Sequence, residues 1–313
     1  MQQKADKLFR EQMTGWPLLA ENRERLDSAL LKSFERDGVT IRVQYNPKRI
    51  TSSSARVDRV SIEARPCFLC RAHRPPEQDF VAVGNGYEIL CNPFPIFRKH
   101  FTIAKADHTP QMIDPEFTAM LDLSRDLPDL VIFYNGPGCG ASAPDHMHFQ
   151  AGNRGFLPLE DELETLMERF GNCLSSNGEC TVTAIDDGLR RFLILESDRK
   201  QPLEDAFSAI SSYMRQLASG DEPMLNLLTY FREGWQIIVF PREKHRPWQY
   251  FDQGEQNILL SPASVDLGGV MITPLEKDFN KITGDDIADI FNQIGLTEKC
   301  FDKLNTFLMQ KLS

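Results

Sequence analysis

Two histidines and a glutamine stand at alternate positions near the middle of the chain, in His146-Met147-His148-Phe149-Gln150. Residues two apart on an extended strand point to the same face. The three polar side chains therefore line one face, and Met147 and Phe149 pack on the other. A glycine-rich turn, residues 135–140, precedes them. This arrangement favours a functional site over a loop that leads into an ordinary strand.

The chemistry open to this arrangement is attack on phosphorus. An imidazole nitrogen can bond to a phosphorus atom and hold the transferred group covalently. The other ring nitrogen must then be held so that the attacking nitrogen keeps its lone pair. A glutamine amide supplies a donor for a phosphoryl oxygen, and glycines let backbone N–H groups approach the remaining oxygens.

A second candidate for chemistry is the cysteine pair in Pro66-Cys67-Phe68-Leu69-Cys70. The C-x₂-C spacing lets two thiolates reach one tetrahedral zinc, which needs two further ligands. Two unrelated thiols or a redox pair are the alternatives, although no thioredoxin-like context surrounds the motif. The histidines that offer themselves as further ligands are His73, His100, His108, His146 and His148.

Composition bounds the class of protein. The 313 residues are 41% hydrophobic and 26% charged, which is typical of a globular chain of one large or two ordinary domains. No segment approaches the roughly 18 apolar residues of a membrane span, and the first residues lack an export signal. We therefore expect a cytoplasmic protein with free thiols. A net charge of −10 opposes binding to a nucleic acid polymer.

The hydrophobic patterns predict alternating helical and extended segments in both halves of the chain. They favour an α+β fold of two units with a related plan, at residues 1–165 and 166–313. The segments expected to be helical are 8–13, 26–34, 115–130, 203–217 and the region from about 285, and those expected to be extended include 41–47, 87–97, 100–106, 129–136 and 237–240.

The histidine motif resembles the H-x-H-x-Q signature of the galactose-1-phosphate uridylyltransferase branch of the histidine-triad superfamily. That branch also contains dinucleoside tetraphosphate phosphorylases and GDP-galactose phosphorylases, and HMHFQA is nearest to the GDP-galactose phosphorylase form. Segments 235–247 and 260–279 are similar to the carboxy-terminal unit of these phosphorylases. Further motifs follow the order of the family across about residues 41–152, namely Tyr45-Asn46-Pro47, the C-x₂-C pair, Asn92-Pro93-Phe94-Pro95, Asp107-His108 and the glycine-rich turn.

The resemblance implies two HIT-like units, each an antiparallel sheet with flanking helices. It also implies a role for individual residues. His148 matches the nucleophile and Gln150 a glutamine that contacts phosphate. Ala143 departs from the family, which usually has serine there, and Ser142 lies one residue earlier. The remaining implied positions are Cys67, Cys70, His108 and His146 as ligands of a structural zinc, Asn92 and Phe94 at the nucleoside, and Asn135, Gly140 and Ser142 at the phosphates.

Basic residues complete the expected site. Arg56 lies on the approach to the cysteine pair, and Lys244 belongs to a Lys-His-Arg-Pro segment that follows an apolar strand. Most surface lysines and arginines are simply solvated. We assign Arg56 and Lys244 to phosphate binding because of their positions.

The resulting functional hypothesis is a nucleotidyltransferase or phosphorylase that works through a nucleotidyl-histidine intermediate. Its substrate would be a nucleotide sugar or dinucleoside polyphosphate, and the acceptor inorganic phosphate or a sugar phosphate. The alternatives are a hexose-1-phosphate uridylyltransferase, a hydrolase of the same bond, and a zinc-stabilised nucleotide-binding protein without turnover. The resemblance is also compatible with a homodimer.

Overall fold

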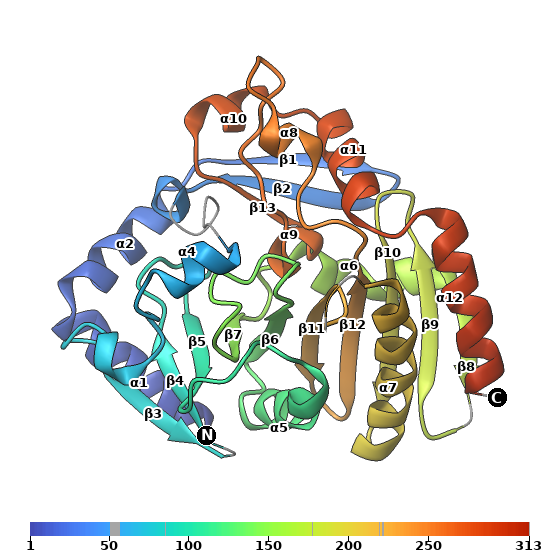
Figure 1. The fold of residues 1–313 in the computed structure, drawn as a ribbon, viewed down its shortest axis with the longest axis horizontal. Coiled ribbons are helices and arrows are strands. Elements are labelled where there is room, and N and C mark those ends of the chain that lie inside the picture. The colour runs from blue at the N-terminus through green and yellow to red at the C-terminus, as the bar shows by residue number, and fades with distance from the viewer. Residues whose placement is uncertain (51–56, 85, 177, 219, 221, 313) are drawn as a thin grey trace.

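A ten-stranded sheet forms the centre of the molecule. The structure is a computed structural model that describes residues 1–313 except 51–56, 85, 177, 219, 221 and 313. Figure 1 shows the strands side by side across the lower part of the view, in the order β3-β4-β5-β7-β6-β11-β12-β10-β9-β8. Their bounds are β3 Phe80–Val83, β4 Tyr87–Cys91, β5 His100–Lys105, β6 Leu130–Asn135, β7 His148–Asn153, β8 Gly171–Ser176, β9 Thr181–Asp186, β10 Arg191–Ser197, β11 Leu225–Phe231 and β12 Trp235–Pro241.

The two halves of this sheet repeat one topology. Counted along the chain, the first five strands lie in the order 1-2-3-5-4, and the second five, read from the opposite edge, lie in the same order. In each half a helix connects the third and fourth strands: α5 (Phe117–Asp126) in the first and α7 (Lys200–Leu217) in the second. The halves meet where β6 and β11 pair antiparallel, with Asn226 opposite Asn135.

Helices cover one face of the sheet almost completely. The side chains of α1 (Gln2–Gly15), α5, α7 and α12 (Glu298–Lys311) pack there in one hydrophobic cluster with Phe149 and Met147. The opposite face packs against α6 (Pro158–Phe170) and α11 (Gly284–Ile294). The shorter helices are α2 Pro17–Asp27, η1 Pro47–Arg49, α4 Arg59–Glu63, η2 Arg71–His73, η3 Asp114–Glu116, α8 Trp248–Phe251, α9 Ser264–Leu267 and α10 Glu276–Lys281.

A small second sheet lies over the opposite face, across the top of Figure 1. It contains β1 (Leu31–Arg36), β2 (Val39–Tyr45) and β13 (Val270–Thr273), so it takes strands from both ends of the chain. The expected helix over residues 26–34 is wrong: α2 ends at Asp27, and β1 pairs with β2 in a hairpin. Its turn is Asp37-Gly38, both at positive φ, which is a strong hairpin signal.

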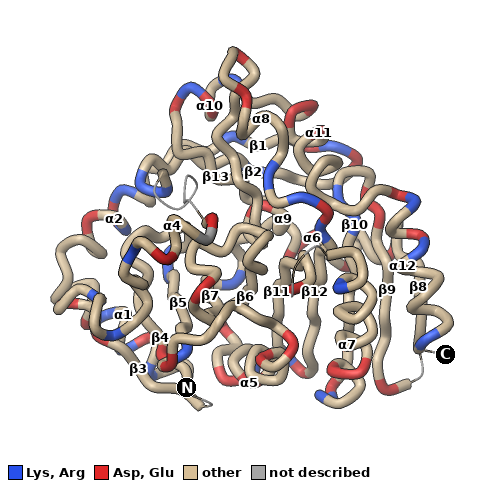
Figure 2. The backbone as a smooth tube through the Cα atoms, viewed as in Figure 1, with Lys and Arg blue, Asp and Glu red and all other residues tan. Residues whose placement is uncertain are grey.

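The structure confirms a mixed α+β fold. That each half is a HIT-like unit, with a boundary at residue 165, stays a prediction. Positive and negative residues are interspersed along both halves of the chain (Figure 2), and the net charge is −10. Among the described residues, no helix is both long and apolar enough to cross a membrane.

Candidate active site

A cavity of about 650 Å³ lies between the first half of the large sheet and the small sheet above it. This volume is in the range of ligand pockets. Its floor comes from β5, β6 and β7, through Thr102, Phe133, His148 and Gln150. The other walls are mostly supplied by η1, α4, the turn after β4, the glycine-rich turn, and the second-half segments 245–246 and 261–272. The cavity therefore draws residues from both halves of the chain.

His148 begins β7 and faces this cavity, with only 4% of its surface exposed. Its Nδ1 lies 2.8 Å from the carbonyl oxygen of His146. A carbonyl can only accept, so Nδ1 carries the proton and Nε2 keeps the lone pair. Nε2 makes no hydrogen bond to any described residue. Burial lowers the pKa of the ring to about 4, so the imidazole is neutral near pH 7.

Gln150 lies on the same face of β7 and is oriented by His100 from the neighbouring strand. The backbone N–H of Ile96 donates to Nδ1 of His100 at 3.1 Å, which leaves the proton of the neutral ring on Nε2. That Nε2–H donates to Oε1 of Gln150 at 3.0 Å. The Gln150 amide nitrogen is therefore turned away from His100, and it donates to no described residue. Its two N–H bonds remain for a ligand in the cavity.

His100, which the sequence suggested was a packing residue or a metal ligand, therefore has a more specific role. Its ring is fully buried between Phe97 and Phe133. Burial, reinforced by the nearby positive charge of Arg49, lowers its pKa to about 3. The ring stays neutral, which this hydrogen-bond pattern requires.

The glycine-rich turn brings Asn135, Gly140 and Ser142 to the cavity wall. Gly140 has φ +98°, and a Cβ there would lie 2.7 Å from Cβ of Ala263. This position therefore requires glycine, both for its backbone conformation and for the close approach of the second-half wall. Ser142 lines the cavity, whereas Ala143 is buried beneath the turn.

Asn92 and Phe94 also line the cavity, in the turn that follows β4. Both ends of the Asn92 amide are engaged within the protein: Nδ2 donates to Oγ1 of Thr102 at 3.1 Å, and Oδ1 accepts from the N–H of Phe94 at 3.0 Å. Asn92 thus shapes the turn, and the Thr102 hydroxyl keeps its own hydrogen for another acceptor.

Three arginines line the cavity among the described residues: Arg49, Arg65 and Arg246. Arg49 donates to the carbonyl oxygen of Phe94 at 3.1 Å, and burial lowers its pKa to about 10. Arg65 donates to the carbonyl oxygen of Ser142 at 3.1 Å and pairs with Asp145 at 3.2 Å, and its Nη1 has no described partner. Arg246 lies 4.1 Å from the ring centroid of Tyr250 and donates to Oγ of Ser261 at 3.0 Å.

Of the two expected basic residues, only Lys244 can be compared with the structure. Arg56 lies outside the described residues. Lys244 is exposed and does not line the cavity; its neighbours His245 and Arg246 do. Arg49 follows the Tyr45-Asn46-Pro47 motif directly, which is the signal that would have identified it. Arg65 carries no such signal, because only the fold brings it beside Ser142.

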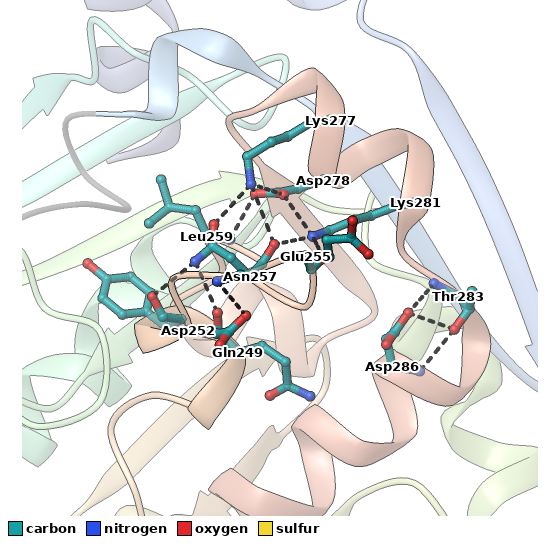
Figure 3. Close-up of polar contacts among 12 residues, drawn as sticks. Gln249, Asp252, Glu255, Asn257, Leu259, Lys277, Asp278, Lys281, Thr283 and Asp286 are labelled. Atoms are coloured by element: carbon teal, nitrogen blue, oxygen red, sulfur yellow. Dashed lines mark hydrogen bonds and ion pairs between the residues drawn. The ribbon is translucent and has the colours of Figure 1, made fainter.

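The wall segment 252–263 is held in place by two lysines of α10 (Figure 3). Lys277 donates to Oδ1 of Asn257 at 2.9 Å and to Oδ1 of the buried Asp278 at 2.8 Å. Lys281 donates to the carbonyl oxygen of Glu255 at 2.8 Å. The N–H of Leu259 closes the network on Oδ2 of Asp278 at 2.8 Å. These contacts fix the segment that ends in Ser261 and Ala263 at the cavity.

A candidate metal site lies directly behind His148. One donor atom each from Cys67, Cys70, His108 and His146 forms a cluster within 4.8 Å. Nδ1 of His146 is 3.3 Å from Sγ of Cys67 and 3.5 Å from Sγ of Cys70, and Nδ1 of His108 is 3.2 Å from Sγ of Cys70. Tetrahedral bonds of about 2.0–2.3 Å place donor atoms about 3.3–3.8 Å apart, so the donor set fits zinc.

The surroundings of this cluster also suit a metal. Nε2 of His146 lies 2.7 Å from the carbonyl oxygen of Lys105, so Nε2 carries the proton and Nδ1 keeps a lone pair for a metal. The peptide bond between Leu69 and Cys70 is anchored by Arg74, which donates to the carbonyl of Leu69 at 2.8 Å and to the buried Glu88 at 2.6 Å. Four protein ligands leave no open position for water, as in a structural site.

Two family profiles match the chain. Residues 8–153 match a domain of unknown function (DUF4922), and residues 165–313 match the "GDPGP1-like, C-terminal domain" family. A comparison with curated protein sequences finds no match. The expected resemblance to this phosphorylase branch is confirmed by the second profile together with the structural matches below.

Crystal structures of yeast Ap4A phosphorylase Apa2 share the fold over most of their length. One matches with a TM-score of 0.59 and 14% identity, covering 90% of this chain and 96% of the yeast chain. The complex with AMP matches with a TM-score of 0.54 and 17% identity, over 90% and 97%. The complex with Ap4A matches with a TM-score of 0.55 and 16% identity, over 89% and 96%.

Proposed function

We propose that this chain, a member of the galactose-1-phosphate uridylyltransferase-like branch of the histidine-triad superfamily, is a phosphorylase-type nucleotidyltransferase acting on a nucleotide sugar or a dinucleoside polyphosphate. The observation that carries the proposal is the state of His148. Its Nδ1 proton is held by the carbonyl of His146, and its neutral Nε2 is unpaired among the described residues, on the wall of a cavity with three arginines.

The reaction proceeds in two displacements. Nε2 of His148 attacks the phosphorus that carries the nucleoside; the N–P bond forms as the P–O bond to the remaining phosphate or sugar phosphate breaks. Inorganic phosphate then attacks the same phosphorus, and the N–P bond breaks. The nucleotidyl group leaves on the phosphate as a nucleoside diphosphate, and His148 regains its lone pair.

Charge that develops on the phosphoryl oxygens meets donors held in place beforehand. The Gln150 amide is fixed by His100, so it presents N–H groups and not its carbonyl. Arg49, Arg65 and Arg246 supply positive charge in a partly desolvated cavity, where such interactions are stronger than in water. The apolar slot around Phe94 is the proposed nucleoside site.

The metal site has a structural role in this proposal. Cys67, Cys70, His108 and His146 would hold a zinc ion, which fixes the segment that leads into β7. His146 then serves two functions: its ring is a ligand, and its carbonyl holds the His148 proton. No step of the reaction needs the metal to contact the substrate.

Intact-protein mass spectrometry tests the proposal. The protein is exposed to a panel of nucleoside diphosphate sugars and dinucleoside polyphosphates without phosphate. An added mass of one nucleoside monophosphate less water is expected, labile in acid and stable in alkali, as a phosphoramidate is. Addition of inorganic phosphate should discharge it and release a nucleoside diphosphate.

Other outcomes separate the alternatives. Discharge by a sugar 1-phosphate but not by phosphate identifies a uridylyltransferase type of acceptor. Product formation in water with no phosphate dependence identifies a hydrolase. Nucleotide binding by calorimetry with no adduct on any substrate contradicts the covalent mechanism and leaves a binding protein.

A further inference from the structure

Asn226 lies on β11, in the half of the chain that carries no part of the histidine motif, and it contacts the glycine-rich turn. It is fully buried opposite Asn135, at the junction where β6 and β11 pair. Its Nδ2 lies 2.8 Å from Oδ1 of Asn135 and 2.8 Å from the carbonyl oxygen of Cys139. Asn135 therefore lies both at the junction of the two halves and on the cavity wall.

The orientation of the Asn226 amide is fixed by a group that can only donate. Nη1 of Arg242, a fully buried guanidinium, lies 2.6 Å from Oδ1 of Asn226. Arginine has no acceptor, so the atom facing it must be oxygen. The nitrogen end of Asn226 then necessarily faces the turn. The same guanidinium donates to the carbonyls of Pro262, Lys244 and His245. His245 lines the cavity, and the other two are chain neighbours of lining residues.

Asn135 is oriented in turn. Its Oδ1 accepts from Nδ2 of Asn226 at 2.8 Å and from the backbone N–H of Ser264 at 2.9 Å. Oγ of Ser264 lies 2.7 Å from this Oδ1 and 2.7 Å from the carbonyl oxygen of Tyr134, and its single proton can serve one of the two. A backbone N–H can only donate, so this end of Asn135 is its oxygen. The Nδ2 end makes no hydrogen bond to a described residue, and Asn135 lines the cavity. The second half of the chain supplies both of these N–H donors and the hydroxyl.

We infer that Asn226 is a positioning residue: anchored by Arg242, it turns the Asn135 amide so that its N–H groups, and not its oxygen, face a phosphoryl group in the cavity. The inference rests on the proposed function. An anion needs donors, and an Asn135 with the opposite orientation would present an acceptor lone pair to it. The second half therefore contributes to the donor set of the site without touching the substrate.

The test is a double-mutant cycle on the rate of nucleotidylation of His148, measured by mass spectrometry in single turnovers. Asn226→Asp keeps the acceptor for Arg242 but places a carboxylate oxygen against Oδ1 of Asn135. We expect a loss of about tenfold in the rate, with nucleotide affinity changed less than about twofold, because the donors act mainly on charge in the transition state. In the Asn135→Ala background the same change should cost nothing further.

Thr229→Val on the same strand is the matched control, because Thr229 is fully buried and its hydroxyl has no partner among the described side chains. It should leave the rate unchanged. If Asn226→Asp does not fold, Ser264→Ala removes the hydroxyl that contacts both the same Asn135 oxygen and the Tyr134 carbonyl, and it should show a smaller loss with the same coupling. Additive losses in the cycle overturn the positioning role. A wild-type protein that forms no adduct on any substrate overturns the proposed function itself.

Discussion

The two halves of the large sheet have the same strand order, but their corresponding strands β7 and β12 carry different side chains. β7 in the first half carries His148 and Gln150 on the face toward the cavity. β12 holds the same place in the second half, and on that face it carries Ile238 and Phe240, which are packed in the hydrophobic core. One topology therefore supports a polar site in one half and a continuous apolar core in the other.

This difference shows which parts of the candidate site come from each half of the chain. The first half supplies His148, the proposed nucleophile, together with Gln150 and the candidate metal cluster. The second half closes the cavity with segments 245–246 and 261–266, and through Asn226 and Ser264 it fixes an amide of the first half. Because its corresponding strand needs no polar side chains, it can be packed for stability alone.

Replacement of His148, in the first half, should cause the largest loss of turnover. His148→Asn removes the nucleophile, and we expect turnover to fall by at least about 10³-fold, as for nucleophiles in other enzymes. Urea denaturation should show little change in stability. The adduct on intact protein should disappear as well. A variant that keeps the adduct would place the chemistry elsewhere.

Cys70→Ser should remove the metal. The metal content, measured by mass spectrometry of the elements, is expected to fall from about one equivalent of zinc to near zero. The nucleotidylation rate should fall with it, because His146 would no longer be fixed by a metal. Cys173→Ser, at an exposed cysteine of the second half, is the control and should change neither value. Wild-type protein that contains no zinc after purification would contradict the proposed metal site.

Ile238→Ala tests whether β12 in the second half contributes to stability and not to turnover. Ile238 is fully buried on β12, so its truncation should lower the free energy of unfolding by about 2–5 kcal/mol. The turnover of the folded fraction should stay near that of the wild type. A large loss of turnover with unchanged stability would show that β12 takes part in the site.

The buried His100 should cause a smaller effect, which is a dependence of the folding stability on pH. Its pKa is about 3 in the folded protein and about 6.5 when unfolded. Below pH 6.5 the unfolded chain takes up a proton that the folded chain does not, so stability falls as the pH falls toward 3, by about 1.4 kcal/mol per unit.

The comparison with a variant isolates this effect. Between pH 7 and pH 5, the wild type should lose about 2 kcal/mol more stability than His100→Gln, in denaturation measured at both pH values. The glutamine can still donate to Oε1 of Gln150. Equal losses in the two proteins would show that His100 becomes protonated inside the fold, contrary to the hydrogen-bond pattern.

The sequence by itself determined the elements with strong local signals. The alternation of His148 and Gln150 predicted that their side chains share a face of β7, because the strand period is two. His146 was expected on the same face, but it precedes β7 and belongs to the metal cluster. The apolar runs located β6, α7 and β12, and the ordered motifs predicted the resemblance to the phosphorylase branch that the second profile supports. It misled at residues 26–34, where an apolar spacing compatible with a helix was overridden by the Asp37-Gly38 turn and by pairing with β2.

Only the tertiary structure decided which groups meet. The metal cluster joins Cys70 to His146 across 76 positions, and Asn135 meets Asn226 across 91. The orientations of the Asn135 and Gln150 amides depend on partners that are 91 and 50 positions away in the sequence. The neutrality of His100 depends on its burial in the folded protein. The tautomer of His148 depends on a carbonyl only two residues earlier, but the residue pattern does not show that this hydrogen bond forms. The sequence shows which residue types are present, and the fold determines which of their atoms carry a proton and which accept a hydrogen bond.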